Sequence, residues 1–363
     1  MRSASGSGRI AETFAGCLLG GAAGDALGWP VEFLSLAEIR RRFGPEGIRD
    51  FAETEGGIGA ITDDTQMTLF TAEGLLREYR RSRETGAPAD YPVAIYRAYL
   101  RWLHTQGEVS RDPAFRDCLD GDLLKVQELH HRRAPGSTCL SALIAGKMGT
   151  VDHPVNTSKG CGGVMRVAPV GLFCRALPDA GDDRARSELA FRLGCDAAAI
   201  THGHPLGYLP AGFLASMIFF LVSGRTLEDS IGDAMLILVE RPEYEKSTLA
   251  ALIARAVRSG LRDKPCPETI ERLGGGWVGE EALAISLYCA LAAKWDFAKG
   301  VRLAVNHSGD SDSTGAIAGN ILGALVGRGA VPGEWGERVE MREVVAGIGT
   351  EIMAVGRVLI EKN

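Results

Sequence analysis

The chain has 363 residues, of which 45% are apolar and 24% charged, and it carries a formal net charge of −6 at pH 7. This composition is typical of a globular protein with a large core and excludes general disorder. The acidic balance argues against a protein whose main activity is binding the nucleic-acid backbone, because that activity requires a basic face. We expect no nucleic-acid partner.

No linker rich in proline, serine or one kind of charge divides the chain. We therefore expect a disordered tail over residues 1–9 and one domain over residues 10–363. The eight cysteines include no Cys-x-x-Cys pair, which favours free thiols in a reducing cytoplasm. The apolar run Leu214–Val222 is too short to span a bilayer. We expect a cytoplasmic monomer without membrane contact.

Apolar residues recur at helical spacing along most of the chain, and strand-like alternation is nearly absent. The sequence therefore predicts an all-α fold. The predicted helices, in chain order, are Phe14–Leu27, Thr65–Arg80, Tyr91–His104, Thr138–Lys147, Glu188–Ile200, Leu206–Val222, Leu227–Leu238, Ser247–Ser259, Glu280–Trp295, Ser313–Val326 and Met341–Glu361.

Glycine is unusually frequent for such a fold, with 47 residues. Two predicted helices carry glycines largely at intervals of four, which lines up a helix face without side chains and lets two backbones approach closely. We expect tight helix packing there. The two sets are Gly16, Gly20, Gly21, Gly24 and Gly28, and Gly315, Gly319, Gly323 and Gly327.

A first acidic cluster, Thr62-Asp63-Asp64-Thr65, stands just before a predicted helix. Any one of these residues could cap the free amide groups of the helix start. Capping explains one such residue well and three in a row badly. Adjacent carboxylates also repel one another unless a cation neutralises them.

A glycine-rich stretch, Ser158–Gly163, lies in the middle of the chain. Its glycines would let successive backbone N–H groups converge on an anion, and Lys159 or Arg166 could add positive charge. Such stretches are common, so this pattern alone is not specific.

A second acidic cluster, Asp310-Ser311-Asp312-Ser313-Thr314, precedes the predicted helix that carries the second glycine set. An EF-hand loop would need a closing Glu at its twelfth position, where this chain has Ile321. A phosphatase nucleophile motif would need to follow a buried strand near the start of an α/β domain. The remaining interpretation is a set of oxygen ligands for Mg²⁺ or Mn²⁺.

The two clusters together would suit a hard divalent metal better than either one alone, because such ions take several oxygen ligands. His202, His204 and His307 could in principle form a zinc or iron site, but the aspartates favour metals that bind oxygen. For His204 we favour ordinary hydrogen bonding. The sequence therefore predicts one bimetal centre assembled from distant parts of the chain.

Five motifs in order and spacing resemble the ADP-ribosylglycohydrolase family, the family of dinitrogen-reductase-activating glycohydrolase. The likeness extends from about Phe14 to about Gly327. The motifs are Gly24-Asp25-Ala26-Leu27-Gly28 with Glu32, Thr62-Asp63-Asp64-Thr65-Gln66, Gly160-Cys161-Gly162-Gly163-Val164-Met165-Arg166, Thr201-His202, and Gly309-Asp310-Ser311-Asp312-Ser313-Thr314-Gly315.

The resemblance implies a compact, single-domain orthogonal helical bundle with two Mg²⁺ or Mn²⁺ ions at the base of a cleft for ADP-ribose. It places the metal ligands at Thr62, Asp63, Asp64, Asp310, Asp312 and Ser313, with Thr314 as a neighbouring candidate. It places a catalytic carboxylate at Glu32, and the substrate-binding residues at Ser158, Gly160, Cys161, Gly162, Gly163 and His202. Many family members have Asn at the position of Cys161, and a thiol cannot replace the donors of an amide.

The resemblance also bears on Gly274–Glu280, which is either a flexible turn entering a helix or a rim where Trp277 stacks on adenine or on the modified side chain. The predicted function is hydrolysis of the bond between ADP-ribose and a modified protein, with N-linked arginine as the leading acceptor. Serine-linked or nucleobase-linked ADP-ribose and a binding module without turnover are the alternatives. Asp63 or Glu32 would be the general base.

Overall fold

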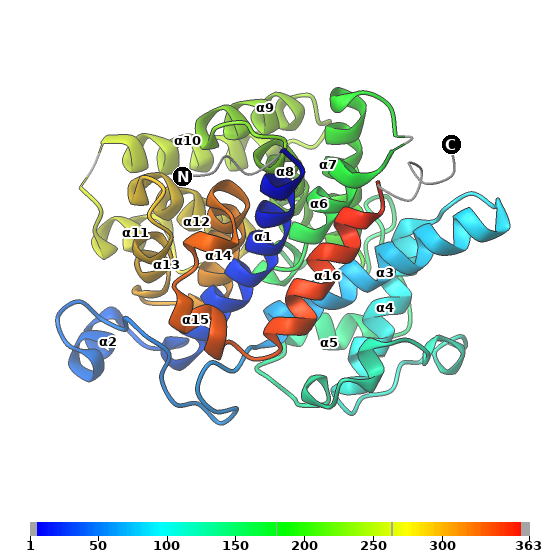
Figure 1. Cartoon of the computed structure of the whole chain (residues 1–363), viewed down its shortest axis with the longest axis horizontal. Coiled ribbons are helices and arrows are strands. Elements are labelled where there is room, and N and C mark those ends of the chain that lie inside the picture. Colours follow the sequence, from blue (N-terminus) through cyan, green and yellow to red (C-terminus); the bar gives the residue numbers. More distant parts are fainter. Residues whose placement is uncertain (1–5, 179, 263, 357–363) are drawn as a thin grey trace.

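The computed structural model describes residues 6–356, except residues 179 and 263. The regular elements of this part of the chain are all helices (Figure 1). It has no β-strand, only an isolated bridge between Gly160 and Val278. The α-helices are α1 (Gly6–Gly28), α2 (Leu36–Phe43), α3 (Asp63–Thr85), α4 (Tyr91–Thr105), α5 (Ser137–Ile144), α6 (Ala168–Ala176), α7 (Asp183–Ala199), α8 (Pro205–Val222), α9 (Leu227–Val239), α10 (Lys246–Arg262), α11 (Pro267–Leu273), α12 (Gly279–Ala293), α13 (Phe297–Val305), α14 (Ser311–Val326), α15 (Gly333–Arg338) and α16 (Arg342–Ala354). The 3-10 helices are η1 (Trp29–Val31), η2 (Arg116–Cys118), η3 (Leu123–Lys125), η4 (Gln127–Leu129), η5 (Cys161–Gly163) and η6 (Arg328–Ala330).

The all-α prediction is confirmed, and every predicted helix is present with shifted ends. α1 already begins at Gly6, so residues 6–9 of the predicted tail are helical, while residues 1–5 lie outside the described residues. No proline interrupts this segment, and Gly6 and Gly8 weaken the helix there without ending it. The last predicted helix ends at Ala354, and residues 357–361 of that prediction also lie outside the described residues.

The periodicity did not predict five helices: α2, α6, α11, α13 and α15. Each spans nine residues or fewer, too short for a stripe of apolar residues to repeat clearly. α2 nevertheless carried a local signal, because Ser35 and Glu38 form a capping box.

The glycines of α1 and α14 pack against each other as the sequence predicted. The two helices lie side by side at the centre of the molecule (Figure 1) and run antiparallel. A Cβ atom on Gly20 would lie 2.4 Å from the carbonyl oxygen of Gly319, and one on Gly24 would lie 2.0 Å from that of Gly315. Only glycine allows this approach. We call this contact the glycine seam.

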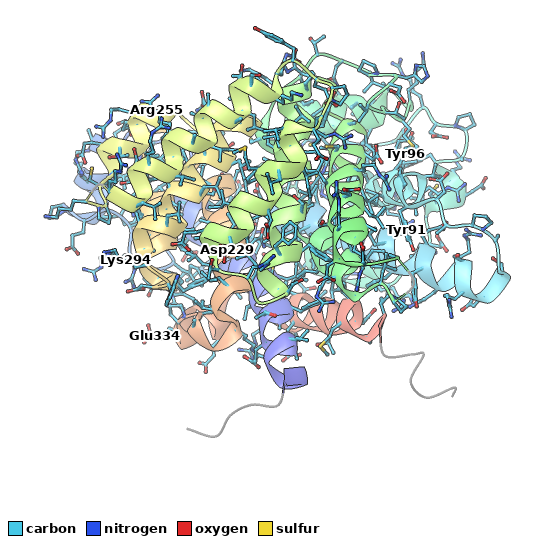
Figure 2. All side chains as sticks on the ribbon, turned by 90° about the horizontal axis from the view of Figure 1, so that it is seen from above. Tyr91, Tyr96, Asp229, Arg255, Lys294 and Glu334 are labelled. Atoms are coloured by element: carbon cyan, nitrogen blue, oxygen red, sulfur yellow. The ribbon has the colours of Figure 1, made fainter. Side chains whose placement is uncertain are left out.

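α8 forms much of the core. It is long and apolar enough, by length and composition, to cross a membrane, which the shorter run Leu214–Val222 did not suggest. However, 89% of it is buried against neighbouring helices, and the core helix of a compact protein passes the same test. Charged side chains such as Arg255 on α10, Lys294 after α12 and Glu334 on α15 lie at the surface instead (Figure 2).

Candidate active site

The glycine seam brings the end of α1 to the beginning of α14. A Cβ atom on Gly28 would lie 2.3 Å from the carbonyl oxygen of Ser311. The chain then passes through η1 to Glu32, whose carboxylate joins those of Asp310 and Asp312: their ligand atoms all lie within 4.8 Å of one another. The end of one helix therefore completes the acidic cluster at the start of another.

Asp25, on α1, anchors the other acidic cluster. Its carboxylate accepts hydrogen bonds from the Thr62 amide (3.0 Å), the Thr65 amide (3.1 Å) and the Thr65 hydroxyl (2.5 Å). These contacts fix the turn where α3 begins. This role was not predicted for Asp25, although an aspartate on an otherwise apolar, glycine-rich helix was the available signal.

The N-termini of α3 and α14 meet. Thr62 caps α3 by accepting from the Asp64 amide (3.3 Å), and Asp310 caps α14 by accepting from the Ser313 amide (3.4 Å). Between the two helices, the Ser313 hydroxyl donates to Asp64 Oδ2 (3.3 Å). Capping is therefore real, but it uses one residue of each cluster and leaves the other carboxylates for another purpose.

A cavity of about 310 Å³ opens over these carboxylates. Its walls come from both acidic clusters, the segment before α5, the glycine-rich stretch and the turn before α12. The lining residues are Glu32, Phe33, Asp63, Asp64, Ala134, Pro135, Gly136, Ser137, Thr138, Cys139, Gly160, Cys161, Gly162, Met165, His202, Trp277, Asp310, Asp312 and Ser313.

Burial and mutual repulsion hold these carboxyl groups toward their protonated forms. The pKa of Glu32 is raised to about 10 by burial and then by the charges of Asp312, Asp310 and Asp63. Burial, followed by the charge of Asp312, raises the pKa of Asp25 to about 7. The pKa values of Asp64 and Asp310 are raised for the same two reasons. Such a cluster ionises fully only when a cation compensates it.

Two carboxylate oxygens in the cluster, Asp64 Oδ1 and Asp312 Oδ1, are buried and have no hydrogen-bond partner. Buried polar atoms of folded proteins are nearly always satisfied. The donor set of carboxylates and a hydroxyl is the set that hard divalent cations prefer. The residues present therefore fit a divalent metal.

The glycine-rich stretch lies opposite the acidic clusters, and several of its amide groups are already bonded. The Ser158 amide donates to Asn156 Oδ1 (3.0 Å) and the Cys161 amide donates to the Trp277 carbonyl (3.1 Å). The Gly160 amide donates to Ser158 Oγ (3.3 Å). Glycine is needed at 163 because a Cβ atom there would lie 2.6 Å from the Gly207 carbonyl oxygen. The stretch is thus a packed wall as well as a potential anion site.

His202 closes the back of this wall as a neutral ring. Burial, with a smaller contribution from the charge of Arg166, lowers its pKa to about 3. Arg166 is itself fully buried and donates to the Thr201 hydroxyl (2.7 Å), which lies 2.8 Å from His202 Nδ1. Because an arginine can only donate, the Thr201 hydroxyl proton is free to go to Nδ1, and Nε2 then carries the ring proton. That atom faces Gly160 and Gly162.

The rim of the cavity is formed by a stacked aromatic pair. The rings of Phe33 and Trp277 lie 5.0 Å apart at an interplanar angle of 23°. Phe33 follows Glu32 directly, has a positive φ of 64° and is 71% exposed. Trp277 lines the cavity, as the rim interpretation of Gly274–Glu280 requires, and its stacking on a ligand stays a prediction. The turn is held by the Glu281 carboxylate, which accepts from the Gly275 amide (3.0 Å).

Some predicted residues lie outside the cavity lining. They are Thr62, Ser158 and Gly163, and each contacts a residue that lines the cavity. Thr62 accepts from the Asp64 amide, the Ser158 hydroxyl bonds that of Thr138, and Gly163 lies beside His202. The Thr314 hydroxyl donates back to the Asp310 carbonyl (2.8 Å) and therefore accepts from His307 Nε2 (2.9 Å). The other candidates have ordinary partners: His204 accepts from the Leu206 amide, and Lys159 pairs with Glu280.

A sequence profile of the ADP-ribosylglycohydrolase family matches residues 7–361. The chain belongs to this family. It is 24% identical over 337 residues to the ADP-ribosyl-[dinitrogen reductase] glycohydrolase of Rhodospirillum rubrum, covering 90% of each chain. It is 24% identical over 352 residues to the ADP-ribosylarginine hydrolase Tri1 of Pseudomonas putida, covering 93% of this chain and 76% of that one.

The fold has a solved counterpart. A structure titled ADP-ribosylglycohydrolase-related protein complex superposes with a TM-score of 0.63 at 24% identity, covering 96% of this chain and 99% of that one. The resemblance inferred from the five motifs is thus confirmed, and this family member is a hydrolase that acts on ADP-ribosyl linkages.

Proposed function

We propose that this ADP-ribosylglycohydrolase cleaves the N-glycosidic bond between ADP-ribose and arginine side chains of modified proteins, using two Mg²⁺ or Mn²⁺ ions. The observation that supports the metal requirement most strongly is the pair of buried, unpartnered oxygens on Asp64 and Asp312, inside a cluster of carboxylates with raised pKa values. Asp63, Asp64, Asp310, Asp312 and Ser313 would hold the ions, with Thr62 as a further candidate. Divalent ions there would supply positive charge that polarises the ribose hydroxyl groups and compensates the carboxylates.

Glu32 is our choice of general base. It lies on the cavity wall and is only partly buried, so a water molecule beside the anomeric carbon can reach its carboxylate. Asp63 Oδ2 already accepts from the Gly136 amide (3.0 Å), which reduces its capacity to take a proton. The remaining carboxylates stabilise the positive charge that develops on the ribose ring. As the C–N bond breaks, its electron pair goes to the guanidine nitrogen, and the proton that Glu32 takes from the water is passed on so that arginine leaves as guanidinium.

The rim supports arginine as the acceptor. The modified protein is too large to enter the cavity, so its side chain must reach the ribose past the cavity wall, which includes the stacked rings of Phe33 and Trp277. A guanidinium is flat and positively charged, and an aromatic face beside a set of carboxylates attracts such a group. A serine acceptor is small and neutral and gains little from that surface. The relative named ADP-ribosylarginine hydrolase agrees with this choice.

The test is to treat the protein with EDTA, remove the chelator, and measure ADP-ribose release from arginine-linked and serine-linked ADP-ribosyl peptides with and without Mg²⁺ or Mn²⁺. We expect release from the arginine peptide only when a cation is restored. Release that is unaffected by EDTA would contradict the metal requirement, and faster release from the serine peptide would contradict the acceptor.

The base is tested with Glu32→Gln, which should lower kcat by about 10²–10⁴-fold and change KM little. The matched control is Glu128→Gln, because Glu128 is an exposed carboxylate outside the cavity lining. If Glu32→Gln raises KM and leaves kcat unchanged, Glu32 binds substrate and Asp63 becomes the candidate base.

A further inference from the structure

Cys161 places a sulfur atom among the oxygen atoms of the acidic cluster. Its Sγ lies 2.7 Å from Asp310 Oδ2 and 3.8 Å from Ser313 Oγ, and it lines the same cavity as Glu32 and Asp312. Cys139, the other cysteine on the cavity wall, instead accepts from the Arg166 guanidinium (3.3 Å). Cys161 is therefore distinct in its surroundings.

The sulfur lies close enough to both groups to share an ion with them. Zinc binds sulfur at about 2.3 Å and carboxylate oxygen at about 2.0–2.2 Å, so two such ligands of one tetrahedral ion lie about 3.6 Å apart. The contact of Cys161 Sγ with Ser313 Oγ (3.8 Å) is near that separation, and the hydrogen bond to Asp310 Oδ2 (2.7 Å) would lengthen by about 1 Å once the ion replaces the thiol proton. An ion held by Asp310 and Ser313 would therefore be within bonding reach of the sulfur.

The sulfur is also held in place from its backbone. The Cys161 amide donates to the Trp277 carbonyl (3.1 Å), Gly160 forms the bridge with Val278, and the Cys161 carbonyl accepts from the Val164 amide (2.9 Å). The position of Sγ beside Asp310 is thus set by the junction of η5 with the turn before α12. Because Sγ is already held in place, the Cys161 side chain would lose little conformational entropy when it binds an ion.

A second observation, independent of the cysteine, points to a ligand in this place. Asp64 Oδ1 and Asp312 Oδ1 are unpartnered in residues that are each 2% exposed, and Asp64 Oδ2 contacts the Ser313 hydroxyl that also neighbours Cys161. The thiol therefore borders a set of oxygen ligands that is still unsatisfied.

We propose that Cys161 is a ligand of the divalent cation held by Asp310 and Ser313, and that it makes this site bind thiophilic cations such as Co²⁺, Zn²⁺ and Cd²⁺ in preference to Mg²⁺. On coordination the S–H bond breaks, the electron pair stays on sulfur to form the metal–sulfur bond, and the proton passes to solvent. Thiolate ligands select softer metals, whereas carboxylates alone suit Mg²⁺ and Mn²⁺. The inference rests on the cation site of the proposed function.

The test is a titration of the metal-free, full-length protein with Co²⁺, followed by absorption in the near ultraviolet, where sulfur-to-cobalt charge transfer is seen. We expect the band in the wild type and its absence in Cys161→Ser. The matched control is Cys266→Ser, because Cys266 is the other half-buried cysteine and lies at the start of α11 outside the cavity lining. That variant should keep the band.

Competition titrations give the second measurement. The affinity for Cd²⁺ should fall at least about tenfold in Cys161→Ser, a loss of the size seen when support of a metal site is removed, while the affinity for Mg²⁺ changes little. An unchanged charge-transfer band or an unchanged ratio of Cd²⁺ to Mg²⁺ affinity in Cys161→Ser would overturn the inference.

The wild-type protein provides a test that does not depend on the folding of a variant. Cd²⁺ should protect Cys161 from alkylation by iodoacetamide, as measured by peptide mass spectrometry, and Mg²⁺ should not. Equal alkylation with and without Cd²⁺ would overturn the thiol ligand. If Mg²⁺ and Mn²⁺ then still bind and support hydrolysis, only this inference fails. If no cation binds, the proposed function fails with it.

Discussion

The acidic and the glycine-rich walls of the cavity hold their shape in different ways. The first turns of α3 and α14 crowd carboxylates together, with Asp64 Oδ1 and Asp312 Oδ1 buried and unpartnered. The opposite wall, from Ser158 to Gly163 with His202 behind it, is held by neutral hydrogen bonds and close glycine packing. A cation would compensate the acidic wall, whereas the glycine-rich wall, apart from Cys161, is held by hydrogen bonds and contacts among protein groups. Substitutions on the acidic wall should therefore act mainly through metal binding, and those on the glycine-rich wall, Cys161 excepted, through substrate contacts.

The largest effect is expected on the acidic wall. Asp312→Asn should lower turnover roughly a thousandfold, since a metal ligand contributes several kcal/mol to stabilising the developing charge. The same change removes a repelling charge, so it should raise the melting temperature measured in EDTA. The exposed Asp117 gives the control Asp117→Asn, which should change neither quantity. Full activity of Asp312→Asn would remove Asp312 from the site.

The glycine seam, which brings the acidic cluster of α14 to the end of α1, should be the next most sensitive region. A Cβ atom on Gly319 would lie 2.0 Å from the Gly20 carbonyl oxygen, so Gly319→Ala should cost about 1–3 kcal/mol in the free energy of unfolding and weaken Mn²⁺ binding. Gly347, in α16, has nothing within 4 Å of its Cβ position. Gly347→Ala should instead stabilise the protein by about 0.5–1 kcal/mol. Urea titrations compare the two, and equal effects would contradict the seam.

A smaller effect is expected on the glycine-rich wall, at His202. His202→Phe removes one neutral donor beside Gly160 and should weaken ADP-ribose binding roughly fivefold, about the free energy of one hydrogen bond. Because burial lowers the pKa of His202 to about 3, the ring stays neutral between pH 6 and 8. Calorimetry of the wild type at saturating Mg²⁺ should give the same ADP-ribose affinity at both values. A fall in affinity across that range would show that the ring is charged at pH 6.

The smallest effect concerns the pH dependence of stability without metal. The pKa of Asp25 is raised from 3.8 to about 7 and that of Glu32 from 4.5 to about 10. The folded state thus keeps protons that the unfolded chain has already released, and this contribution to stability falls as pH rises from about 4 toward 7 for Asp25 and 10 for Glu32. In EDTA the melting temperature should drop by a few degrees between pH 5 and 9. With saturating Mn²⁺ the drop should disappear.

The sequence was sufficient to predict which residues form the acidic wall, because clustered carboxylates and hydroxyls are recognisable without a structure. Runs such as Thr62-Asp63-Asp64 and Asp310-Ser311-Asp312 have few explanations other than a cation, and glycines every four residues indicate which helices touch. The long helices were predictable for a similar reason, since each repeats its apolar stripe over several turns.

The remaining features depend on contacts between distant positions that no local pattern records. Phe33 and Trp277 form the rim only because η1 and the turn before α12 meet, and Cys161 reaches Asp310 only through its bond to the Trp277 backbone. Asp25 was visible in the sequence, but its hydrogen bonds to Thr62 and Thr65 follow from the packing of α1 on α3. Short helices such as α13 were missed because their apolar stripe is brief: α13 has only nine residues, although Phe297, Val301, Ala304 and Val305 are buried at helical spacing.

The most direct measurement is a titration of the metal-free protein with Mn²⁺, followed by electron paramagnetic resonance, on the wild type, Asp64→Asn and Asp312→Asn. If the starts of α3 and α14 jointly hold the metals, the wild type should bind two ions whose spectrum shows magnetic coupling, and either substitution should abolish that coupled signal. A wild type that binds no Mn²⁺, or variants that both keep the coupled signal, would contradict the account.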